Sequence, residues 1–481
     1  MPHGSARPYL MLGLLAVALV ACSAQPTRVV ATAPEELEWA QRDAVTAWPE
    51  RDWFRGFGSP ELDGLIMQAS QGNLDLQAAA ERVIQADARG RQVHAAILPS
   101  LEADANANYL AGHSSNGSLH ETDWSALLSA SYEVDFWGRN RAKAGAATYL
   151  GLASRADRDT LRLTTEAGVA STYFEIISLR ERLATARANV DSAQQLLGIV
   201  QAQLKAGYAS PVEVATQSAA LASLQAAIPE LEQTQTRALT ALALLLGRSP
   251  EHFDVTAQSL EALHEPAVAP GLPAELLRRR PDVAVAEANL AAAHADLQVV
   301  RTALFPSLTL TAAGGLQNPA LNAAVNTLSG VGPTLNLGAA LAQAVFDGGR
   351  LRAQQLEAGS REQELLANYR ASILAALVDV ENSLAGIARL DAARSAQQEV
   401  LTQSERAFEG ARVRYQKGYG DFLSVLAAQR AVYAARDQYN QYRLARLQAS
   451  VSLCKALGGG WQIEQIDPSS TLPAAESPGR P

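Results

Sequence analysis

Residues 101–109 read Leu-Glu-Ala-Asp-Ala-Asn-Ala-Asn-Tyr, so apolar and polar side chains alternate at each step. Successive side chains of a β-strand point to opposite faces, which makes one face of such a strand apolar and the other polar. Residues 124–136 alternate in the same way, with Leu127 as the one apolar residue on the polar face. The polar residues 113–123 predict a loop between the two runs. We therefore predict paired strands at 100–112 and 122–137.

The same pattern recurs later in the chain and predicts strands at 306–317 and 334–347, although the last run alternates less cleanly. Segments of about ten residues with one apolar face are typical of transmembrane β-barrels. A half-buried sheet in a soluble domain shows the same alternation. Because about eight strands are the practical minimum for a closed barrel, and unpaired strand edges cannot face lipid, four membrane strands require an oligomer.

The chain is an internal duplication. Leu98-Pro99-Ser100-Leu101 recurs 207 residues later as Phe305-Pro306-Ser307-Leu308, and Gly207-Tyr208 recurs 211 residues later as Gly418-Tyr419. This period is too long for a solenoid array. We predict repeat 1 at 61–255 and repeat 2 at 256–461, each with a helix, two strands, a very long helix, a turn and a final helix.

The long helices are predicted from heptads at 138–206 and 348–417, followed by helices at 211–246 and 421–457. In the first, apolar residues recur every seven positions and small residues fill the second seam. The first seam consists of Val169, Ile176, Leu183, Val190, Leu197 and Leu204. A helix of about 70 residues would be roughly 100 Å long. A soluble coiled-coil scaffold would show the same heptads, so they do not decide between the alternatives.

The amino terminus predicts export. Residues 1–21 contain Arg7 and a short apolar run, as in a signal peptide. Leu19-Val20-Ala21-Cys22 resembles the bacterial lipobox, which implies cleavage before Cys22, acylation of that cysteine (including palmitate) and a lipidated segment at 22–60. Ser23 in place of Asp implies sorting to the outer membrane. The tail 462–481 is polar and is predicted to be disordered.

Composition excludes several classes of function. The net charge of −9 provides no basic excess for nucleic acid. Two Cys without a pairing pattern and seven scattered His predict no disulfide framework and no metal site. No catalytic constellation is visible, so we expect a protein that is not an enzyme and has no cofactor beyond the lipid on Cys22.

Three short motifs, in order, resemble the TolC-like outer membrane factor family in its efflux lipoprotein branch (OprM/NodT-like). Trp53 to Leu62 resembles the branch's WW-x-x-F-x-D-P-x-L opening, with Phe54 and Ser59 as departures; the other two motifs are Asn73-Leu74-Asp75-Leu76 and Leu277-Arg278-Arg279-Arg280-Pro281-Asp282. With the duplication, the likeness covers nearly all of 45–461.

The resemblance implies a mainly α protein with transmembrane β-strands: a homotrimer with a 12-stranded barrel in outer-membrane lipid and a 12-helix periplasmic α-barrel. It implies a passive exit duct for drugs or other small molecules, as in multidrug resistance, joined to a periplasmic adaptor and an inner-membrane RND-type pump. An exit duct for type I protein secretion has the same fold and remains an alternative.

The resemblance also suggests site residues. Helix tips that contact the adaptor would comprise Gly207, Tyr208, Gly418, Tyr419 and Gly420. The family commonly has acidic residues just past the second tip, whereas this chain has Ser424 and Ala427 there. We therefore expect the periplasmic constriction at Asp421, Leu423, Ser424 and Leu426, although an Asp that only starts a helix is an equal alternative. From the polar strand faces we expect Glu102, Asp104, Glu133 and Asp135 to line the lumen.

Overall fold

The structure is a computed structural model that describes residues 47–114, 117–268, 273–276, 278–318 and 332–462. The expected signal peptide, Cys22 and most of the tail lie outside these residues. The elements are, in chain order, η1 (Trp53–Phe57), α2 (Pro60–Gly72), α3 (Leu74–Ala95), β1 (Ser100–Ser114), β2 (Gly117–Val134), α4 (Arg139–Lys205), α5 (Pro211–Leu245), η2 (Leu260–Ala262), α6 (Pro273–Leu276), α7 (Pro281–Thr302), β3 (Ser307–Asn318), β4 (Gly332–Ala342), α8 (Arg350–Gln416) and α9 (Phe422–Ala456).

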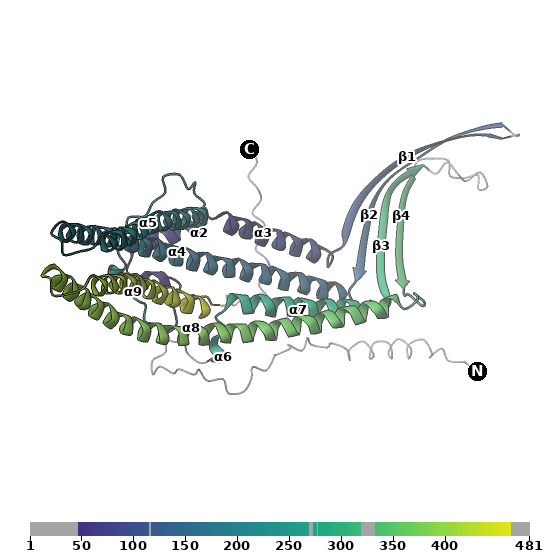
Figure 1. The fold of residues 1–481 in the computed structure, drawn as a ribbon. Coiled ribbons are helices and arrows are strands. Elements are labelled where there is room, and N and C mark those ends of the chain that lie inside the picture. Colours follow the sequence, from purple (N-terminus) through teal and green to yellow (C-terminus); the bar gives the residue numbers. More distant parts are fainter. Residues whose placement is uncertain (1–46, 115–116, 269–272, 277, 319–331, 463–481) are drawn as a thin grey trace. The chain divides into compact units, whose positions relative to one another are not determined.

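The four strands form one antiparallel sheet in the order β1-β2-β3-β4, side by side in Figure 1. Within the described chain, β1 pairs only with β2 and β4 pairs only with β3, so both outer strands have an unpaired edge. The strand register places the apolar residues of the four strands on the same face of the sheet. One row of the apolar face consists of Ala103, Leu128, Gly314 and Leu335.

The strand bounds correct part of the sequence prediction. The expected loop at 113–123 is wrong, because β1 continues to Ser114 and β2 begins at Gly117. Backbone hydrogen bonds pair the two strands along this stretch whatever its side chains are, with Cα partners such as His113 and Ser118. Conversely, the ends expected at 137 and 347 were too late: β2 stops at Val134 and β4 stops at Ala342.

The helices show the duplication most clearly. α3 and α7 have 22 residues each, α4 and α8 have 67 each, and α5 and α9 have 35 each. At 1.5 Å per residue, α4 and α8 are each roughly 100 Å long. Within its own repeat, each packs against two shorter helices that follow one another along it: α3 and α5 along α4, and α7 and α9 along α8. α4 also packs against α7 and α9 of the second repeat. The heptad residues Val169 and Ile176 are fully buried in α4, and Val380 is fully buried in α8.

A close backbone contact joins the two shorter helices in each repeat. In repeat 1, the Asn73 side chain accepts from Leu76 N and donates from Nδ2 to Leu245 O at 2.9 Å. Gly247 follows with φ +66°, and a Cβ there would lie 2.0 Å from Gly72 O. The end of α5 is thereby fixed against the start of α3. The sequence suggested one helix at the start of the repeat, but this contact accompanies a break at Asn73 between α2 and α3.

In repeat 2, Arg280 takes the place of Asn73. Its Nη1 donates to Ala456 O at 3.2 Å, its guanidinium binds Asp282 through two hydrogen bonds, and Nη2 also reaches Asp379 of α8 at 3.0 Å. A Cβ on Gly458, which has φ +86°, would lie 1.8 Å from Arg279 O. The Arg-Arg-Pro-Asp motif therefore locks α7, α8 and α9 together.

The main apolar core surrounds the middle of α4. Phe57, Leu62, Tyr173, Phe174 and Leu242 are almost completely buried there. Full burial of one such large side chain contributes about 1.5–3 kcal/mol. The core thus unites η1, α2, α4 and α5 in a belt about halfway along the long helices.

Candidate functional site

The two helix tips have the same backbone geometry. Gly207 and Gly418 have φ of +82° and +76°, a region that favours glycine because it has no Cβ. Tyr208 N donates to Gln203 O at 2.8 Å, and Tyr419 N donates to Arg414 O at 2.9 Å. These bonds satisfy carbonyls at the helix ends and reverse the chain. Gly420 lies close to the Arg414 side chain: a Cβ on this glycine would lie 3.2 Å from Cβ of Arg414.

Both tip tyrosines project into solvent. Tyr208 is 86% exposed and Tyr419 is 77% exposed. Exposed aromatic side chains at the end of a rigid helix pair are available to a partner, because aromatic residues are enriched in protein interfaces. The tips therefore offer a contact surface, whereas their glycines are explained by the turn alone.

Three of the four residues expected at the constriction are exposed, and the fourth is buried. Asp421 caps α9: its carboxylate accepts from Ser424 N at 2.8 Å and from Ser424 Oγ at 2.7 Å. These hydrogen bonds from the Ser424 hydroxyl and then its backbone lower the pKa of Asp421. Asp421, Leu423 and Ser424 are exposed, but Leu426 is only 6% exposed. The expectation for Leu426 is wrong, because its side chain packs between α4 and α9.

Leu426 belongs to an apolar cluster that connects the two helix pairs near their tips. It packs with Leu196 and Val200 of α4 and with Tyr415 and Val425. Next to this cluster, a buried polar chain crosses the same helices. Gln217 of α5 donates to Ala193 O and to Gln429 Oε1, and Gln429 donates to Tyr433 OH, which donates to Asn189 O. Sequence reasoning missed these residues, since buried Gln and Tyr in a heptad helix give no separate signal.

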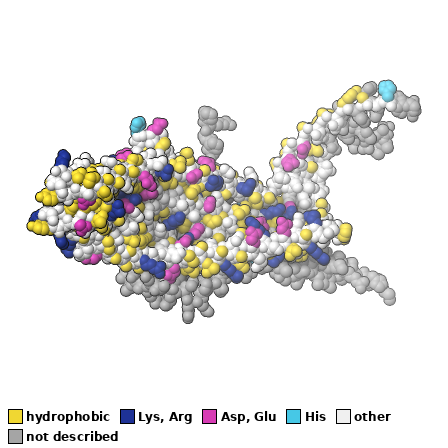
Figure 2. All heavy atoms as spheres, viewed as in Figure 1, with side chains coloured by type: hydrophobic (Ala, Val, Ile, Leu, Met, Phe, Trp, Pro, Cys, Tyr) yellow, Lys and Arg dark blue, Asp and Glu magenta, His cyan; other side chains and the backbone are white. Residues whose placement is uncertain are grey.

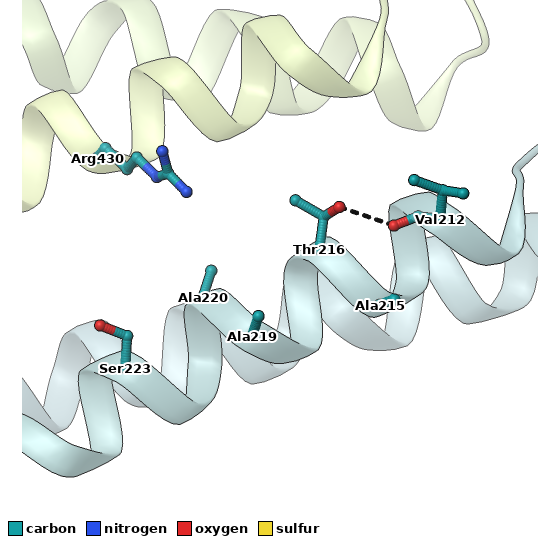
Figure 3. A pocket seen from close by; sticks show the side chains of 7 residues that line it. All are labelled: Val212, Ala215, Thr216, Ala219, Ala220, Ser223 and Arg430. Atoms are coloured by element: carbon teal, nitrogen blue, oxygen red, sulfur yellow. Dashed lines mark hydrogen bonds between the residues drawn. The ribbon is translucent and has the colours of Figure 1, made fainter.

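A groove of about 510 Å³ lies between α5 and α9 close to the tips. Figure 3 shows Arg430 of α9 opposite Val212, Thr216, Ala220 and Ser223 of α5. Thr216 Oγ1 donates to Val212 O at 2.8 Å, so its hydroxyl is already satisfied within the helix. The small α5 side chains leave a shallow surface with one cation at its rim.

The polar strand face carries fewer free carboxylates than the sequence suggested. Glu102 and Asp104 are exposed on β1. Glu133 Oε2 instead accepts from Arg139 Nη2 at 3.1 Å. The expectation for Asp135 is wrong: it lies past the end of β2 and is 11% exposed, and it accepts from the backbone N of Asn140 and Arg141 at 3.0 Å each. Helix starts favour such acceptors.

The other face of the sheet is apolar, and its large side chains are exposed. Leu101, Leu128, Leu335, Leu337 and Leu341 are each more than half exposed. The view in Figure 2 shows charged side chains over the helices and few along the strands. Near the ends of the strands, Trp137 stacks on Phe305 at 4.8 Å and donates from Nε1 to Pro306 O. Exposed leucines bordered by aromatic residues are typical of a lipid-facing barrel surface.

An open sheet with an apolar outer face, continued by long paired helices, defines a subunit of an outer-membrane channel. Comparison with known proteins agrees. The family model described as outer membrane efflux protein matches residues 65–248 and 272–459, one segment for each repeat. The chain belongs to the outer membrane efflux protein family, and it is an outer-membrane channel component of an efflux system.

Three relatives illustrate the likeness. The pyoverdine export outer membrane protein OpmQ of Pseudomonas aeruginosa is 42% identical, over 94% of this chain and 98% of its own. The cation efflux system protein CusC of Escherichia coli is 30% identical, over 93% of this chain and 98% of its own. The solved outer-membrane channel OprN matches with a TM-score of 0.83 at 27% identity, over 92% of this chain and all of its own. These matches confirm the expected family and the mainly α fold with four strands per chain.

Proposed function

We propose that three copies of the chain close a 12-stranded barrel and a 12-helix tunnel that together form a passive exit duct. The unpaired edges of β1 and β4 support oligomer closure, because each edge needs a partner strand in lipid. Exposed apolar residues on α8, such as Leu374 and Val378, would be covered by neighbouring copies. The observation that carries the proposal is the open four-stranded sheet with one apolar face.

The same proposal includes two partners: a periplasmic adaptor at the Gly-Tyr tips and an inner-membrane RND-type pump. The exposure of Tyr208 and Tyr419 and the groove beside them support an adaptor contact. The test of this contact is affinity purification of the full chain from cross-linked cells, with mass spectrometry to identify the partners. An adaptor with a proton-driven transporter is the expected result. Recovery of an ABC exporter instead would favour type I protein secretion.

As the exported substrate we propose pyoverdine or a small molecule of the same class. Support comes from the 42% identity to the pyoverdine export channel, against 30% to the cation channel. The chain is expressed in a pyoverdine-producing Pseudomonas strain without its own OpmQ, and pyoverdine in the medium is measured by mass spectrometry. We expect export to be restored, and we expect no rescue of metal tolerance in cells without CusC. The reverse pattern would contradict this substrate.

The lipid anchor on Cys22 remains part of the proposal and gives a direct prediction. Cys22→Ser should remove the acyl chains, which intact-mass analysis of the purified protein detects as the loss of the lipid mass. Cys454→Ser is the matched control, because that thiol is 1% exposed and burial raises its pKa to about 12. Acylation that survives in the Cys22→Ser protein would show that the lipid is attached elsewhere.

The constriction at Asp421, Leu423 and Ser424 gives a second prediction. Three copies of Asp421 around a three-fold axis would form an acidic ring that narrows the tunnel. Asp421→Asn removes the charge and keeps an acceptor for Ser424 N, so single-channel conductance in planar bilayers should change about twofold or more, because the charge of the ring sets the local ion concentration at the constriction. Asp157→Asn, an exposed position on α4, is the control. Equal conductance of all three proteins would leave Asp421 as a helix cap only.

Ion selectivity tests the polar strand face. Glu102 and Asp104 would line the lumen with no cationic side chain of the described residues bound to them, whereas Arg139 neutralises Glu133. The local field should favour cations modestly. Reversal potentials in a salt gradient measure this preference, and the double variant Glu102→Gln with Asp104→Asn should abolish it. Anion preference in the unmodified channel would refute the assignment of this face to the lumen.

A further inference from the structure

A second groove, of about 950 Å³, lies where the helices meet the sheet. It is lined by the first turn of α4, the last turns of α7 and the first part of α8. Ligand pockets in proteins commonly measure about 300–1,000 Å³, so this space is large enough for a small solute. Sequence reasoning gave no reason to expect it.

The contacts of Arg139 indicate which face of the subunit the groove lies on. This residue lines the groove, and its Nη2 donates to Glu133 Oε2 at 3.1 Å. Glu133 belongs to the polar face of the sheet, opposite the face that carries Leu101 and Leu128. The groove therefore begins next to the polar strand face. If that face lines the channel, as the proposed function has it, the groove opens into the channel.

A single chain lines the whole groove. Its floor is α7, which packs between α4 and α8 of the same chain. Subunit contacts require the β1 and β4 edges at the two sides of the sheet. The groove thus lies inside one subunit's share of the wall, and the proposed trimer would contain three such grooves.

The groove offers charges of both signs that are not used by the fold. Lys143 on one wall, and Asp296 and Glu357 on the floor and other wall, make no ion pair or hydrogen bond to any described residue. The Asp296 side chain is exposed, and partial desolvation raises its pKa. The Nε atom of Arg139 is buried and has no partner among the described residues. Buried polar atoms are normally hydrogen-bonded, so this atom is an unsatisfied donor beside the groove.

Apolar side chains also line the groove. Val299, Val300 and Ala303 of α7 form the apolar part of its floor. A solute that complements these side chains carries an anionic group for Lys143 and Arg139, a cationic group for Asp296 and Glu357, and apolar carbon atoms as well.

We propose that this groove is a transit site for amphoteric, peptide-like solutes that carry both a carboxylate and an ammonium or guanidinium group. This inference rests on the proposed function and deepens it by naming the chemistry of the solute. Because a duct must release what it binds, the site has to be weak, as in other conducting pores. Binding there would slow the passage of such solutes and reduce the ion current only while a solute occupies the site.

The test is block of the open channel by a defined probe. The full-length channel is inserted into planar bilayers, and the tripeptide Asp-Val-Lys is added on the periplasmic side. Matched probes are the same peptide with its carboxylates amidated and the same peptide with its amines acetylated. We expect only the amphoteric peptide to give saturable block, with a millimolar Kd. Lys143→Gln and Asp296→Asn should each raise that Kd about tenfold.

Lys205→Gln is the matched control, because it changes the same residue type in the same helix but at the opposite end. It should leave the Kd unchanged. Equal block by all three peptides, or an unchanged Kd in both groove variants, overturns the inference. Conductance without peptide is the separate readout: no pore at all would refute the proposed function, whereas a pore without peptide-dependent block would refute only this site.

Discussion

Gly458→Ala should prevent stable folding of the subunit. The new Cβ would lie 1.8 Å from Arg279 O and 2.8 Å from Arg279 C, both of them backbone atoms. In addition, φ at this position is +86°, which costs an L-residue about 1–2 kcal/mol. Overpacking against a fixed backbone adds about 1–3 kcal/mol. The amount of assembled channel in outer-membrane extracts and its melting temperature should both fall sharply.

The contact in the other repeat should respond in the same way. A Cβ on Gly247 would lie 2.0 Å from Gly72 O, so Gly247→Ala should be comparably damaging. Gly386→Ala is the control, since a Cβ on this α8 glycine meets nothing within 4 Å of it in the chain. A helical Gly→Ala change stabilises by about 0.5–1 kcal/mol. Equal melting temperatures for the Gly458 and Gly386 variants would contradict our account of the junction.

Arg280→Met is the second variant with a large expected effect. The Arg280 side chain is 10% exposed and binds Asp282, Asp379 and Ala456 O. Removing one partner of a buried ion pair costs about 3–5 kcal/mol, because the remaining charges lose their counter-ion. Since Asp379 is 54% exposed and can be solvated, we expect the lower end of that range. Denaturant unfolding of the purified channel measures the loss.

The neighbouring Arg278→Met is the control for Arg280. Arg278 is exposed and has no side-chain partner among the described residues, so its loss should change stability by less than about 0.5 kcal/mol. The pH dependence gives a further check. Burial alone would raise the pKa of Asp282, but hydrogen bonding and charge from Arg280 lower it below its ordinary value.

A carboxyl with a lowered pKa contributes stability above its unfolded pKa, near 4, and loses this contribution as the pH falls through the folded value. Acid unfolding of the unmodified channel should therefore include a step below about pH 4 that is absent from the Arg280→Met protein. A step of equal size in both proteins would show that Asp282 does not depend on Arg280.

The sequence predicted those features that repeat or alternate. The heptads, the strand pairs and the duplication are local patterns, and the structure contains 67-residue helices in both halves and four strands in one sheet. The extension of the β1–β2 hairpin was missed because the sequence of residues 113–123 does not alternate between apolar and polar. Its pairing, such as His113 with Ser118, depends on the backbone rather than on the side chains.

Single residues were harder to place than elements. Asp135 continues the alternation of the strand before it, yet its carboxylate accepts from the first turn of α4. Leu426 lies near the second tip in sequence but on the inner face of its helix. Gly138-Arg139-Asn140-Arg141 recurs 211 residues later as Gly349-Arg350-Leu351-Arg352 at the start of each long helix, but this recurrence reflects the duplication and does not predict the groove, which only Arg139 among these residues lines.

The unpaired edges of β1 and β4 have a consequence for inheritance. A subunit with one sound edge and one damaged edge would still join its neighbours and leave a single seam open. In a cell that makes normal and damaged subunits together, the share of sound trimers would fall with the cube of the share of sound subunits. A mutation confined to one edge strand would therefore be dominant, whereas a mutation that unfolds the whole subunit would be recessive.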